Sequence, residues 1–356
     1  MSDDNEISKR RESIDRIDGE ILRLLSRRGA EAVAIGKLKT GAVFRPEREA
    51  QVLRGIQRAN PGPLTDAGVA AVFRSIMSAC LALERPLRLA YLGPAGTFSE
   101  AAAIKGFGEA AELLPVESLD EAFRETDAGT TDYAIVPVEN STEGTIGHTL
   151  DLLLTTPLVI CGEVVLRINQ NVLRKGKSLD GIRRIYSHVQ SLAQCTHWLA
   201  RHLPGVEQVP VASNAEAARM AAEHPEACAI AGELAATRYE LDIVVPNIED
   251  EPNNSTRFLI VGKHDAGPTG DDKTSFVMAA PNRPGALYEL LAPLAEHGVS
   301  MNKFESRPSR GGLWEYFFFV DIEGHRDDAK VAAALKAVAE RAASFKIFGS
   351  YPVAPF

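Results

Sequence analysis

The sequence predicts a multidomain chain with an all-α region, a two-lobed α/β region and a ferredoxin-like α+β region. Residues 1–86 show helical periodicity and no strand pattern, whereas strand-like runs alternate with short capped helices over residues 87–266. Residues 273–356, which follow a polar linker, show the order β-α-β-β-α-β. The total of 356 residues suits two or three domains.

The first region is expected to contain three helices. Apolar residues at spacings of three, four and seven predict a long amphipathic helix from Ile7 to about Lys39, which ends at Thr40-Gly41. Two shorter helices are predicted at about 47–59 and 66–83, each followed by proline. Two short partners cannot cover the apolar stripe of so long a helix, so we expect the chain to dimerise.

The second region alternates strands with helices that begin at capping boxes. The predicted strands are Leu89–Leu92, Tyr133–Val138, Val159–Val165, Arg184–Tyr186, Ala227–Ala231 and Phe258–Val261. The capping boxes pair Thr97 with Glu100, Ser118 with Glu121 and Ser213 with Glu216. This alternation predicts an α/β domain with a mainly parallel sheet, divided into two lobes around a cleft. Ligands in such folds bind where strands end and helices begin.

The third region follows the polar stretch His264–Asp272, which is expected to be a linker. Its predicted elements, strand, helix, strand, strand, helix and strand in order, are Thr274–Ala280, Ala286–His297, Val299–Glu305, Glu315–Ile322, Asp327–Ala342 and Phe345–Ser350. A module of this size after a linker is more often regulatory or dimerising than catalytic.

Composition excludes several classes of function. The formal net charge of −9 argues against nucleic acid or an anionic membrane as a partner. Four widely spaced cysteines, Cys80, Cys161, Cys195 and Cys228, indicate neither a disulfide framework nor a zinc knuckle. No apolar stretch approaches a membrane span and the amino terminus does not read as a secretory signal, so a cytoplasmic location is expected.

Basic residues on the long first helix form one candidate site. Arg28 and Lys39 lie about 20° apart around the helix axis, while Arg11 lies about 26 Å from Arg28 along it. Joint use of all three would require two subunits to exchange helices; the alternative is a solvated basic face. The segments that decide the interpretation are Arg11–Asp18, Arg27-Arg28, Gly36–Lys39 and Arg45–Glu49, and together they resemble the all-helical chorismate mutases.

This resemblance implies an intertwined dimer. Arg28, Lys39 and Arg48 would hold the substrate together with Arg11 of the partner subunit, and Glu49 would accept a hydrogen bond from the substrate hydroxyl. The sequence departs from some members of the family at two positions: Glu84 replaces a frequent Gln, and Cys80 replaces a Ser. Both residues share a face of the third helix and belong to the expected catalytic set.

Five motifs in the α/β region form the second candidate site. They are Tyr91–Ser99, Val136–Gly144, Ser187–Gln190, Ser213–Ala218 and Asn254–Phe258. The first lacks the lysine of a phosphate-binding loop, and each of the first two motifs taken alone is typical of a capped helix start. Together and in this order they resemble prephenate dehydratase, which implies two lobes of the periplasmic-binding-protein kind. Two departures occur, Val189 for a usual Pro and Asn214 for a frequent Thr.

The dehydratase resemblance assigns roles to individual residues. Thr256 would donate to the departing hydroxyl, and Arg257 and Phe258 complete the catalytic Thr-Arg-Phe motif. The expected substrate contacts are Thr97, Ser99, Glu139, Asn140, Ser141, Thr142, His188, Gln190, Ser213 and Asn214. A purely structural role for His188 remains the alternative. In the dehydratase reaction that the resemblance implies, loss of carbon dioxide supplies the electron pair that expels the hydroxyl. The histidines are not spaced like metal ligands. Neither a metal nor a cofactor is therefore predicted.

The last region resembles an ACT regulatory domain at Gly285–Tyr288 and Asn302–Pro308. The residues implied to bind phenylalanine are Gly285, Ala286, Leu287, Asn302, Glu305, Ser306, Arg307 and Pro308. A plain dimerisation module is the alternative. Together the resemblances imply a bifunctional enzyme, inhibited by phenylalanine, that forms a homodimer or a dimer of dimers. The rival hypothesis is an effector-sensing binding protein whose helical part serves only for dimerisation.

Overall fold

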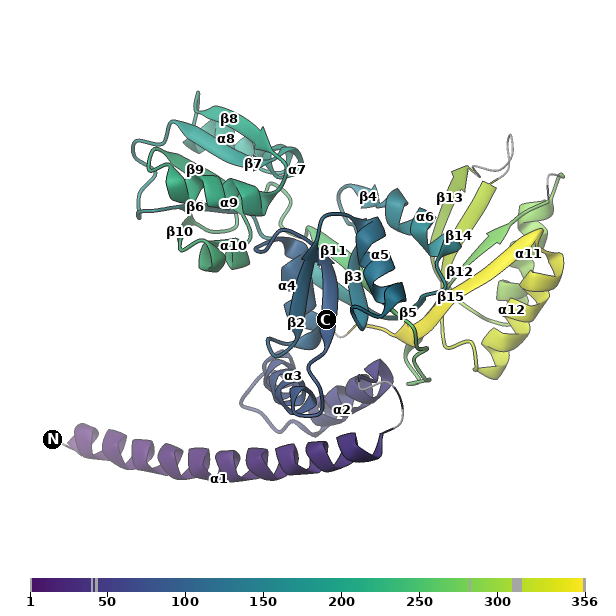
Figure 1. Ribbon diagram of the computed structural model, residues 1–356, viewed down its shortest axis with the longest axis horizontal. Helices are drawn as coiled ribbons and strands as arrows, with labels where there is room; N and C mark the ends of the chain where they lie inside the picture. The colour runs from purple at the N-terminus through teal and green to yellow at the C-terminus, as the bar shows by residue number, and fades with distance from the viewer. Residues whose placement is uncertain (1, 40, 42–43, 282, 309–315, 355–356) are drawn as a thin grey trace. The chain divides into compact units, whose positions relative to one another are not determined.

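The computed structural model describes residues 2–39, 41, 44–281, 283–308 and 316–354 (Figure 1). Within these residues the chain forms two compact units. The first comprises 1–45, 53–87 and 107–112, and the second 46–52, 88–106 and 113–356. The expected helix end at Thr40 and the expected strand start at Glu315 lie outside the described residues.

The predicted helices of the N-terminal region are confirmed. They are α1 (Ser2–Leu38), α2 (Pro46–Ala59) and α3 (Asp66–Ala82). Proline at the first position suits the start of α2, and the Thr65 side chain caps α3 by accepting from Gly68 N at 3.1 Å. α1 and the end of α3 approach closely at Gly36, where a Cβ would lie 2.9 Å from Cγ of Glu84. Glycine at this position therefore leaves room for the Glu84 side chain.

The first lobe of the α/β region contains one sheet in the order β2-β1-β3-β11-β5, with β4 paired to β3. Its strands are β1 (Arg88–Leu92), β2 (Glu112–Val116), β3 (Tyr133–Asn140), β4 (Gly144–Thr145), β5 (Val159–Arg167) and β11 (Ser255–Gly262). Its helices are α4 (Phe98–Phe107), α5 (Leu119–Ala128) and α6 (Gly147–Thr155).

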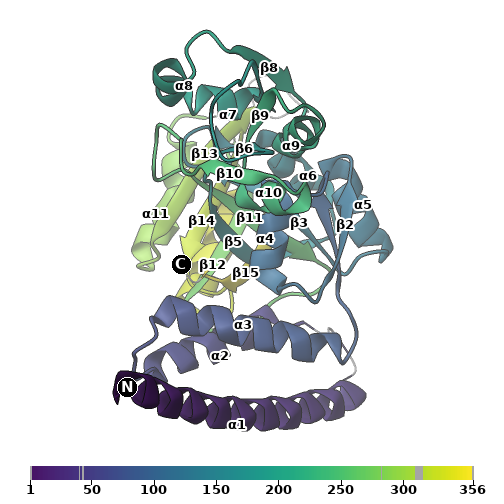
Figure 2. The ribbon, with the colours of Figure 1, turned by 90° about the vertical axis from the view of Figure 1, so that its left-hand side faces the viewer.

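The second lobe has a sheet in the order β10-β6-β9-β7-β8. Its strands are β6 (Asn171–Arg174), β7 (Arg184–His188), β8 (Glu207–Val211), β9 (Ala227–Ala231) and β10 (Asp242–Val245). Its helices are α7 (Val189–Ala193), α8 (Thr196–His202), α9 (Asn214–Glu223) and α10 (Glu233–Arg238). α9 and α10 pack on one face of this sheet, and α7 and α8 pack on the other (Figures 1 and 2).

The expectation of mainly parallel sheets is wrong, because both sheets are mixed. β3 runs parallel to β1, and β7 runs parallel to β8 and β9. β11, however, is antiparallel to both β3 and β5, and β6 is antiparallel to β9 and β10. The physical reason is the long excursion of the chain: β11 returns from the second lobe and inserts between β3 and β5. Local periodicity contains no information about the direction of such a return.

The C-terminal region has the predicted β-α-β-β-α-β order. Its elements are β12 (Asp272–Ala279), α11 (Ala286–Glu296), β13 (Met301–Pro308), β14 (Tyr316–Glu323), α12 (Ala329–Arg341) and β15 (Ser344–Pro352). The antiparallel sheet has the order β13-β14-β12-β15, with β13 at one edge. The preceding coil is held in place, since Arg326 Nη2 lies 2.6 Å from Asp265 Oδ2 and His325 contacts the carbonyl oxygen of Ala266.

The C-terminal sheet and the first lobe share one hydrophobic core. Helices α11 and α12 cover one face of this sheet, while Phe319, Phe348 and Tyr351 from the other face pack with residues of β3, β5 and β11 (Figure 1). The backbones of β15 and β5 approach so closely that a Cβ at Gly349 would overlap the carbonyl oxygen of Ile160. The α/β and α+β regions are therefore joined by packing as well as by the connecting coil.

Candidate functional site

Two residues of the first candidate site form an ion pair in the helical unit. Nζ of Lys39, at the end of α1, lies 2.9 Å from Oε2 and 3.3 Å from Oε1 of Glu84, just beyond α3. The Glu84 side chain is only 7% exposed. Cys80, one turn earlier, is buried. The structure therefore brings together a predicted substrate cation and the residue that departs from the family pattern.

The other residues predicted for this site lie on α1 and α2. Arg28 is half-buried, Arg11 is exposed, and the two are separated by seventeen residues of continuous helix. Arg48 and Glu49 lie in the first turn of α2, where Arg48 is exposed and Glu49 is half-buried. Since α1 is one continuous helix over both residues, Arg11 and Arg28 of one chain cannot contact the same small substrate.

The second candidate site is centred on a contact between β3 and β11. Asn140 Nδ2 donates to Thr256 Oγ1 at 2.8 Å, across a pair of residues in register. The orientation of the Asn140 amide is fixed because its Oδ1 accepts from the backbone amides of Thr142 at 3.0 Å and Glu143 at 3.1 Å. Thr256 Oγ1 thus acts as an acceptor, and its own hydrogen remains available for another group.

A hydrogen-bond network extends from this pair to the second lobe. Asn140 Nδ2 also donates to Asn254 Oδ1 at 2.9 Å, and Asn254 donates to Gln194 Oε1 at 3.0 Å. Gln194 also accepts from Gln170, which donates to Ser191 Oγ at 2.9 Å. The final link is Asn214, which donates to Ser191 and accepts from the backbone amide of His188. Four of the five motifs are therefore connected through amide and hydroxyl groups.

Three members of this network were missed by the sequence reasoning: Gln170, Ser191 and Gln194. Ser191 and Gln194 lie within four residues after the third motif, Ser187–Gln190, in and just beyond the short helix α7. Their closeness to that motif was the signal that could have identified them. Gln170 precedes β6 and is 1% exposed. Nothing in its sequence context distinguishes it from a loop residue, because its role depends on contact with α7.

Several predicted contacts act locally as helix caps. Thr97 Oγ1 donates to the carbonyl oxygen of Leu92 and accepts from Glu100 N, while Ser99 is buried. Ser213 Oγ accepts from Glu216 N at 3.0 Å, and His188 Nδ1 accepts from Gln190 N. Ser141 Oγ accepts from Ser255 N at 2.9 Å. The capped-start interpretation is therefore confirmed for Tyr91–Ser99 and is wrong for Val136–Gly144, where β3 turns into β4 instead of entering a helix.

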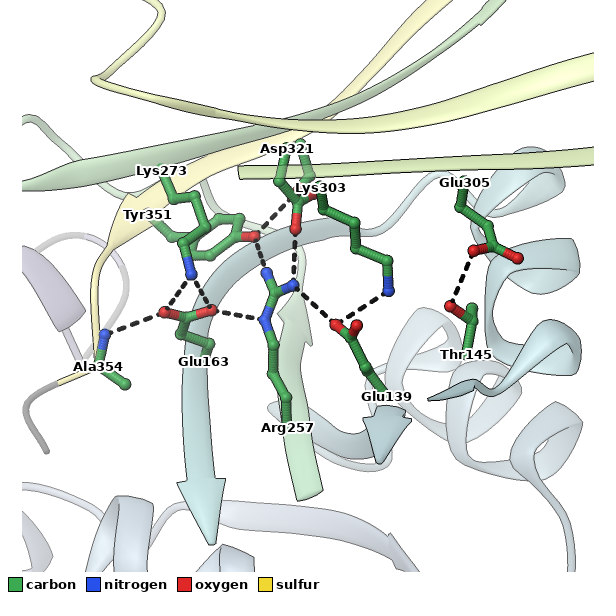
Figure 3. Close-up of polar contacts among 11 residues, drawn as sticks. Glu139, Thr145, Glu163, Arg257, Lys273, Lys303, Glu305, Asp321, Tyr351 and Ala354 are labelled. Atoms are coloured by element: carbon green, nitrogen blue, oxygen red, sulfur yellow. Dashed lines mark hydrogen bonds and ion pairs between the residues drawn. The ribbon is translucent and has the colours of Figure 1, made fainter. Parts of the chain in front are cut away.

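Arg257 does not lie with Thr256, although the two are neighbours in the sequence. Successive side chains of a strand point to opposite faces, and the Arg257 guanidinium points toward the C-terminal sheet (Figure 3). It lies 2.6 Å from Asp321 Oδ2 of β14 and 2.7 Å from Glu163 Oε2 of β5. Glu139 likewise faces this side, and Phe258, 2% exposed, packs in the core.

The residues predicted to bind phenylalanine occupy the start of α11 and the edge strand β13. Gly285 caps α11 with a φ of 79°, followed by buried Ala286 and half-buried Leu287. Asn302 and Ser306 are exposed on β13, which ends at Pro308. Glu305 and Arg307 contact the first lobe: Glu305 Oε2 accepts from Thr145 at 3.2 Å, and Arg307 Nη2 lies 3.3 Å from Asp151.

Two further properties concern only the described residues. They contain no cluster of three or more histidine, cysteine or acidic side chains arranged to hold a metal ion. No helix among them combines the length and the hydropathy that crossing a membrane requires.

Family models match the chain in three segments: chorismate mutase type II at 10–85, prephenate dehydratase at 89–266 and the ACT domain at 274–340. A bifunctional chorismate mutase/prephenate dehydratase from Neisseria gonorrhoeae is 57% identical over 97% of this chain and 96% of its own length. The crystal structure of prephenate dehydratase in complex with L-Phe from Arthrobacter aurescens is 36% identical, with a TM-score of 0.69, and covers 75% of this chain and 90% of that one.

A second solved structure, described as the quorum-quenching acylase GqqA, is 30% identical with a TM-score of 0.70 and covers 75% of this chain and 98% of that one. It therefore matches a part of the chain, whereas the Neisseria relative matches nearly all of it. The three segments occur in the order predicted from the motifs. This chain belongs to the family of bifunctional chorismate mutase/prephenate dehydratases that carry an ACT domain.

Proposed function

We propose that this chain rearranges chorismate to prephenate in residues 1–86 and converts prephenate to phenylpyruvate in residues 87–266, under the control of residues 273–356. The observation that carries the proposal is the hydrogen-bond network from Thr256 through Asn140 to Asn214, because it links the dehydratase motifs of both lobes. Family membership supports both activities.

The mutase step needs neither a nucleophile nor a metal, since the rearrangement is unimolecular. The protein has to hold a dicarboxylate in a compact conformation and stabilise the negative charge that develops on the ether oxygen. We assign the carboxylates to Arg28, Lys39 and Arg48, with Arg11 supplied by the partner subunit. Glu49 accepts from the substrate hydroxyl, and Cys80 and Glu84 line the site. The Lys39–Glu84 ion pair supports this arrangement because it holds the Lys39 ammonium in place.

The dehydratase step expels carbon dioxide and the ring hydroxyl together. As the C–CO₂ bond breaks, its electron pair moves into the ring and the hydroxyl leaves, so a group that polarises or protonates the leaving oxygen accelerates the reaction. We assign this role to Thr256. Its oxygen accepts from Asn140, which orients its hydrogen toward the substrate and stabilises charge on the threonine oxygen. The substrate's carboxylates and carbonyl are assigned to the substrate contacts predicted above, except Glu139, which faces the ACT sheet.

Phenylalanine is proposed as the effector, bound by the start of α11 and by β13. The Arthrobacter protein, which was crystallised with L-Phe, supports this assignment. Because β13 is the edge of its sheet, a second ACT domain can approach along it. The contacts of Glu305 and Arg307 with the first lobe give this segment a direct connection to the dehydratase region.

A homodimer and a cytoplasmic location complete the proposal. Ile14 and Ile17 on α1 are 54% and 52% exposed, as expected for a helix that a second chain covers. All four cysteines are free and buried, which suits a reducing compartment.

A single assay tests the proposed activities. The purified chain is given chorismate, and phenylpyruvate is followed by its ultraviolet absorbance, with and without phenylalanine. We expect phenylpyruvate to form and phenylalanine to suppress it. If prephenate accumulated without phenylpyruvate, the dehydratase assignment would be wrong; if no chorismate were consumed while phenylalanine still bound, the effector-sensing binding protein would be the correct description.

A further inference from the structure

Two neighbouring residue pairs on β3 and β11 point in opposite directions. The register pairs Asn140 with Thr256 and Glu139 with Arg257. Asn140 and Thr256 form the proposed site, whereas Oε2 of Glu139 and Nη1 of Arg257 lie 3.7 Å apart on the face toward the ACT sheet (Figure 3). The backbone joins the two pairs without an intervening residue, so a movement of one pair is passed to the other.

The ACT-facing pair is held by side chains from three strands of the ACT sheet, β13, β14 and β15. Arg257 Nη1 lies 2.6 Å from Asp321 Oδ2, and Nη2 donates to Tyr351 Oη at 2.8 Å. Lys303 Nζ of β13 lies 3.0 Å from Glu139 Oε2, in contact as an ion pair without hydrogen-bond geometry. The Arg257 and Lys303 side chains are only 13% and 14% exposed, so these contacts are largely shielded from water.

The network is balanced in charge, which makes each member depend on the others. Its cations are Arg257, Lys273 and Lys303, and its carboxylates are Glu139, Glu163 and Asp321. Burial alone would lower the pKa of the Arg257 guanidinium, but Tyr351 and the carboxylates of Asp321 and Glu163 outweigh burial and raise that pKa above its usual value. Removing one partner of such a shielded pair leaves the other charge buried without a counter-charge.

The strand β13 contacts both strands at the base of the hairpin that carries the site. Lys303 contacts Glu139 of β3, and Glu305 accepts from Thr145 of β4; Glu139 and Thr145 are themselves paired in register. The tip of this hairpin contains Asn140, Ser141 and Thr142, three of the proposed substrate contacts. The proposed effector strand therefore holds the substrate loop at its base.

A small cavity lies beside these contacts. It lies between the two sheets and is lined by Arg257, Lys303 and Asp321 together with apolar residues such as Val138 and Leu259. Protein interiors are closely packed and transmit strain, so a shift of Asp321 or Lys303 is passed on to Arg257 and Glu139.

We propose that Glu139 and Arg257 are positioning residues that transmit the position of the ACT strands β13 and β14 to the catalytic pair Asn140–Thr256. This inference rests on the proposed function, because it names the route by which phenylalanine on β13 changes dehydratase activity. Neither residue needs to touch the substrate in this role.

The first experiment compares two lysines that cross the same interface. In Lys303→Met the contact with Glu139 is lost. The control is Lys346→Met. It removes an ammonium that donates to the carbonyl oxygens of Leu153, Leu154 and Thr156 at the end of α6, and not to the site hairpin. We expect Lys303→Met to raise the dehydratase activity that remains at saturating phenylalanine at least about tenfold, because effector binding no longer reaches the site. Phenylalanine affinity, measured by equilibrium dialysis, should change less than about threefold, and Lys346→Met should respond to phenylalanine like the wild type.

Double substitution shows whether the pair acts as a unit. Glu139→Gln and Lys303→Met together should shift inhibition no further than the larger single effect, because they remove the same contact. Equal shifts in Lys303→Met and Lys346→Met, or additive effects of Glu139→Gln and Lys303→Met, would overturn the proposed route and indicate general loosening of the interface.

The second experiment uses no phenylalanine and so separates this inference from the proposed regulation. In Asp321→Asn we expect dehydratase kcat to fall about tenfold with KM changed less than twofold, because Thr256 is misplaced while the substrate contacts remain. Near-ultraviolet circular dichroism and denaturant unfolding followed by dehydratase activity report intact folding of the dehydratase–ACT region. An unchanged kcat in Asp321→Asn would overturn the positioning role. A rise in KM confined to Arg257→Lys would instead indicate direct contact of Arg257 with substrate. Absence of inhibition in the wild type would refute only the proposed effector.

Discussion

The helical region and the dehydratase–ACT region of this chain bury their apolar residues in different ways. In the latter, one cluster extends from β3 and β11 into the ACT strands and includes Phe319, Phe348 and Tyr351, all nearly inaccessible to solvent. In the former, the apolar stripe of α1 is open: Ile14, Ile17 and Leu24 are each more than half exposed. The dehydratase core is complete within one chain, whereas the helical region leaves an apolar face that a second chain can cover.

The two candidate sites differ in the same way. The Thr256–Asn140 pair and its network come from one chain, but Arg11 and Arg28 lie too far apart on α1 to serve a single mutase site. We therefore expect dehydratase chemistry to depend on local contacts and mutase chemistry to depend on assembly. The shared core also implies that deleting the ACT region would expose dehydratase residues, so point substitutions test regulation more cleanly than truncation.

The largest effect is expected for Thr256→Ala. Loss of the hydroxyl should lower dehydratase turnover by at least about 10²-fold, the usual scale for a missing acid or polarising donor. Mutase turnover should stay within a few-fold, and Thr256→Ser should restore much of the dehydratase rate. Both activities are measured on the same preparation; a parallel fall in both with the fold intact would contradict independent sites.

A charged residue in the open stripe of α1 should have the next largest effect. Ile17→Glu is expected to separate the dimer and lower mutase turnover by about tenfold or more, because a buried, unpaired carboxylate opposes association. Dehydratase turnover should change little. Sedimentation and both activities are measured for Ile17→Glu and for the control Ala30→Glu, which adds the same charge on another face of the helix. A monomer that kept full mutase activity would show that the site is complete in one chain.

The joint core can be tested at Gly349. Gly349→Ala places a methyl group against the Ile160 backbone, which is overpacking that costs about 1–3 kcal/mol of the free energy of unfolding. The denaturant concentration at which half of the dehydratase activity is lost should fall. The concentration at which half of the mutase activity is lost should stay the same as in the unsubstituted chain. Equal loss of both activities would mean that the two units unfold together.

The smallest effect is expected for Glu84→Gln. An ionised carboxylate can only accept hydrogen bonds, whereas an amide can donate to the ether oxygen of the substrate. The glutamine oxygen can still accept from Lys39 Nζ, so the ammonium stays in place and we expect mutase turnover at pH 8 to rise by a few-fold. Glu49→Gln is the matched comparison and should lower turnover. Unchanged turnover in Glu84→Gln would show that this side chain does not reach the reacting atoms.

Much of the fold could be predicted because its signals are local. Helical periodicity located α1, α2 and α3, and capping boxes located the starts of α5 and α9, since each reports on contacts within a few residues. The short strands β2, β6, β8 and β10 were missed because their hydrophobic runs are brief and their pairing partners are distant. The direction of β11 was missed for the same reason.

The three regions, their order and the motifs that identify the family could all be predicted from local sequence patterns. Tertiary structure decided how those motifs are divided between functions. Thr256 and Arg257 are adjacent in one motif, yet strand alternation directs Thr256 toward Asn140 and Arg257 toward Asp321 of the ACT sheet. Sequence proximity fixes which residues share a strand, but only the neighbours packed on each face decide what each side chain contacts.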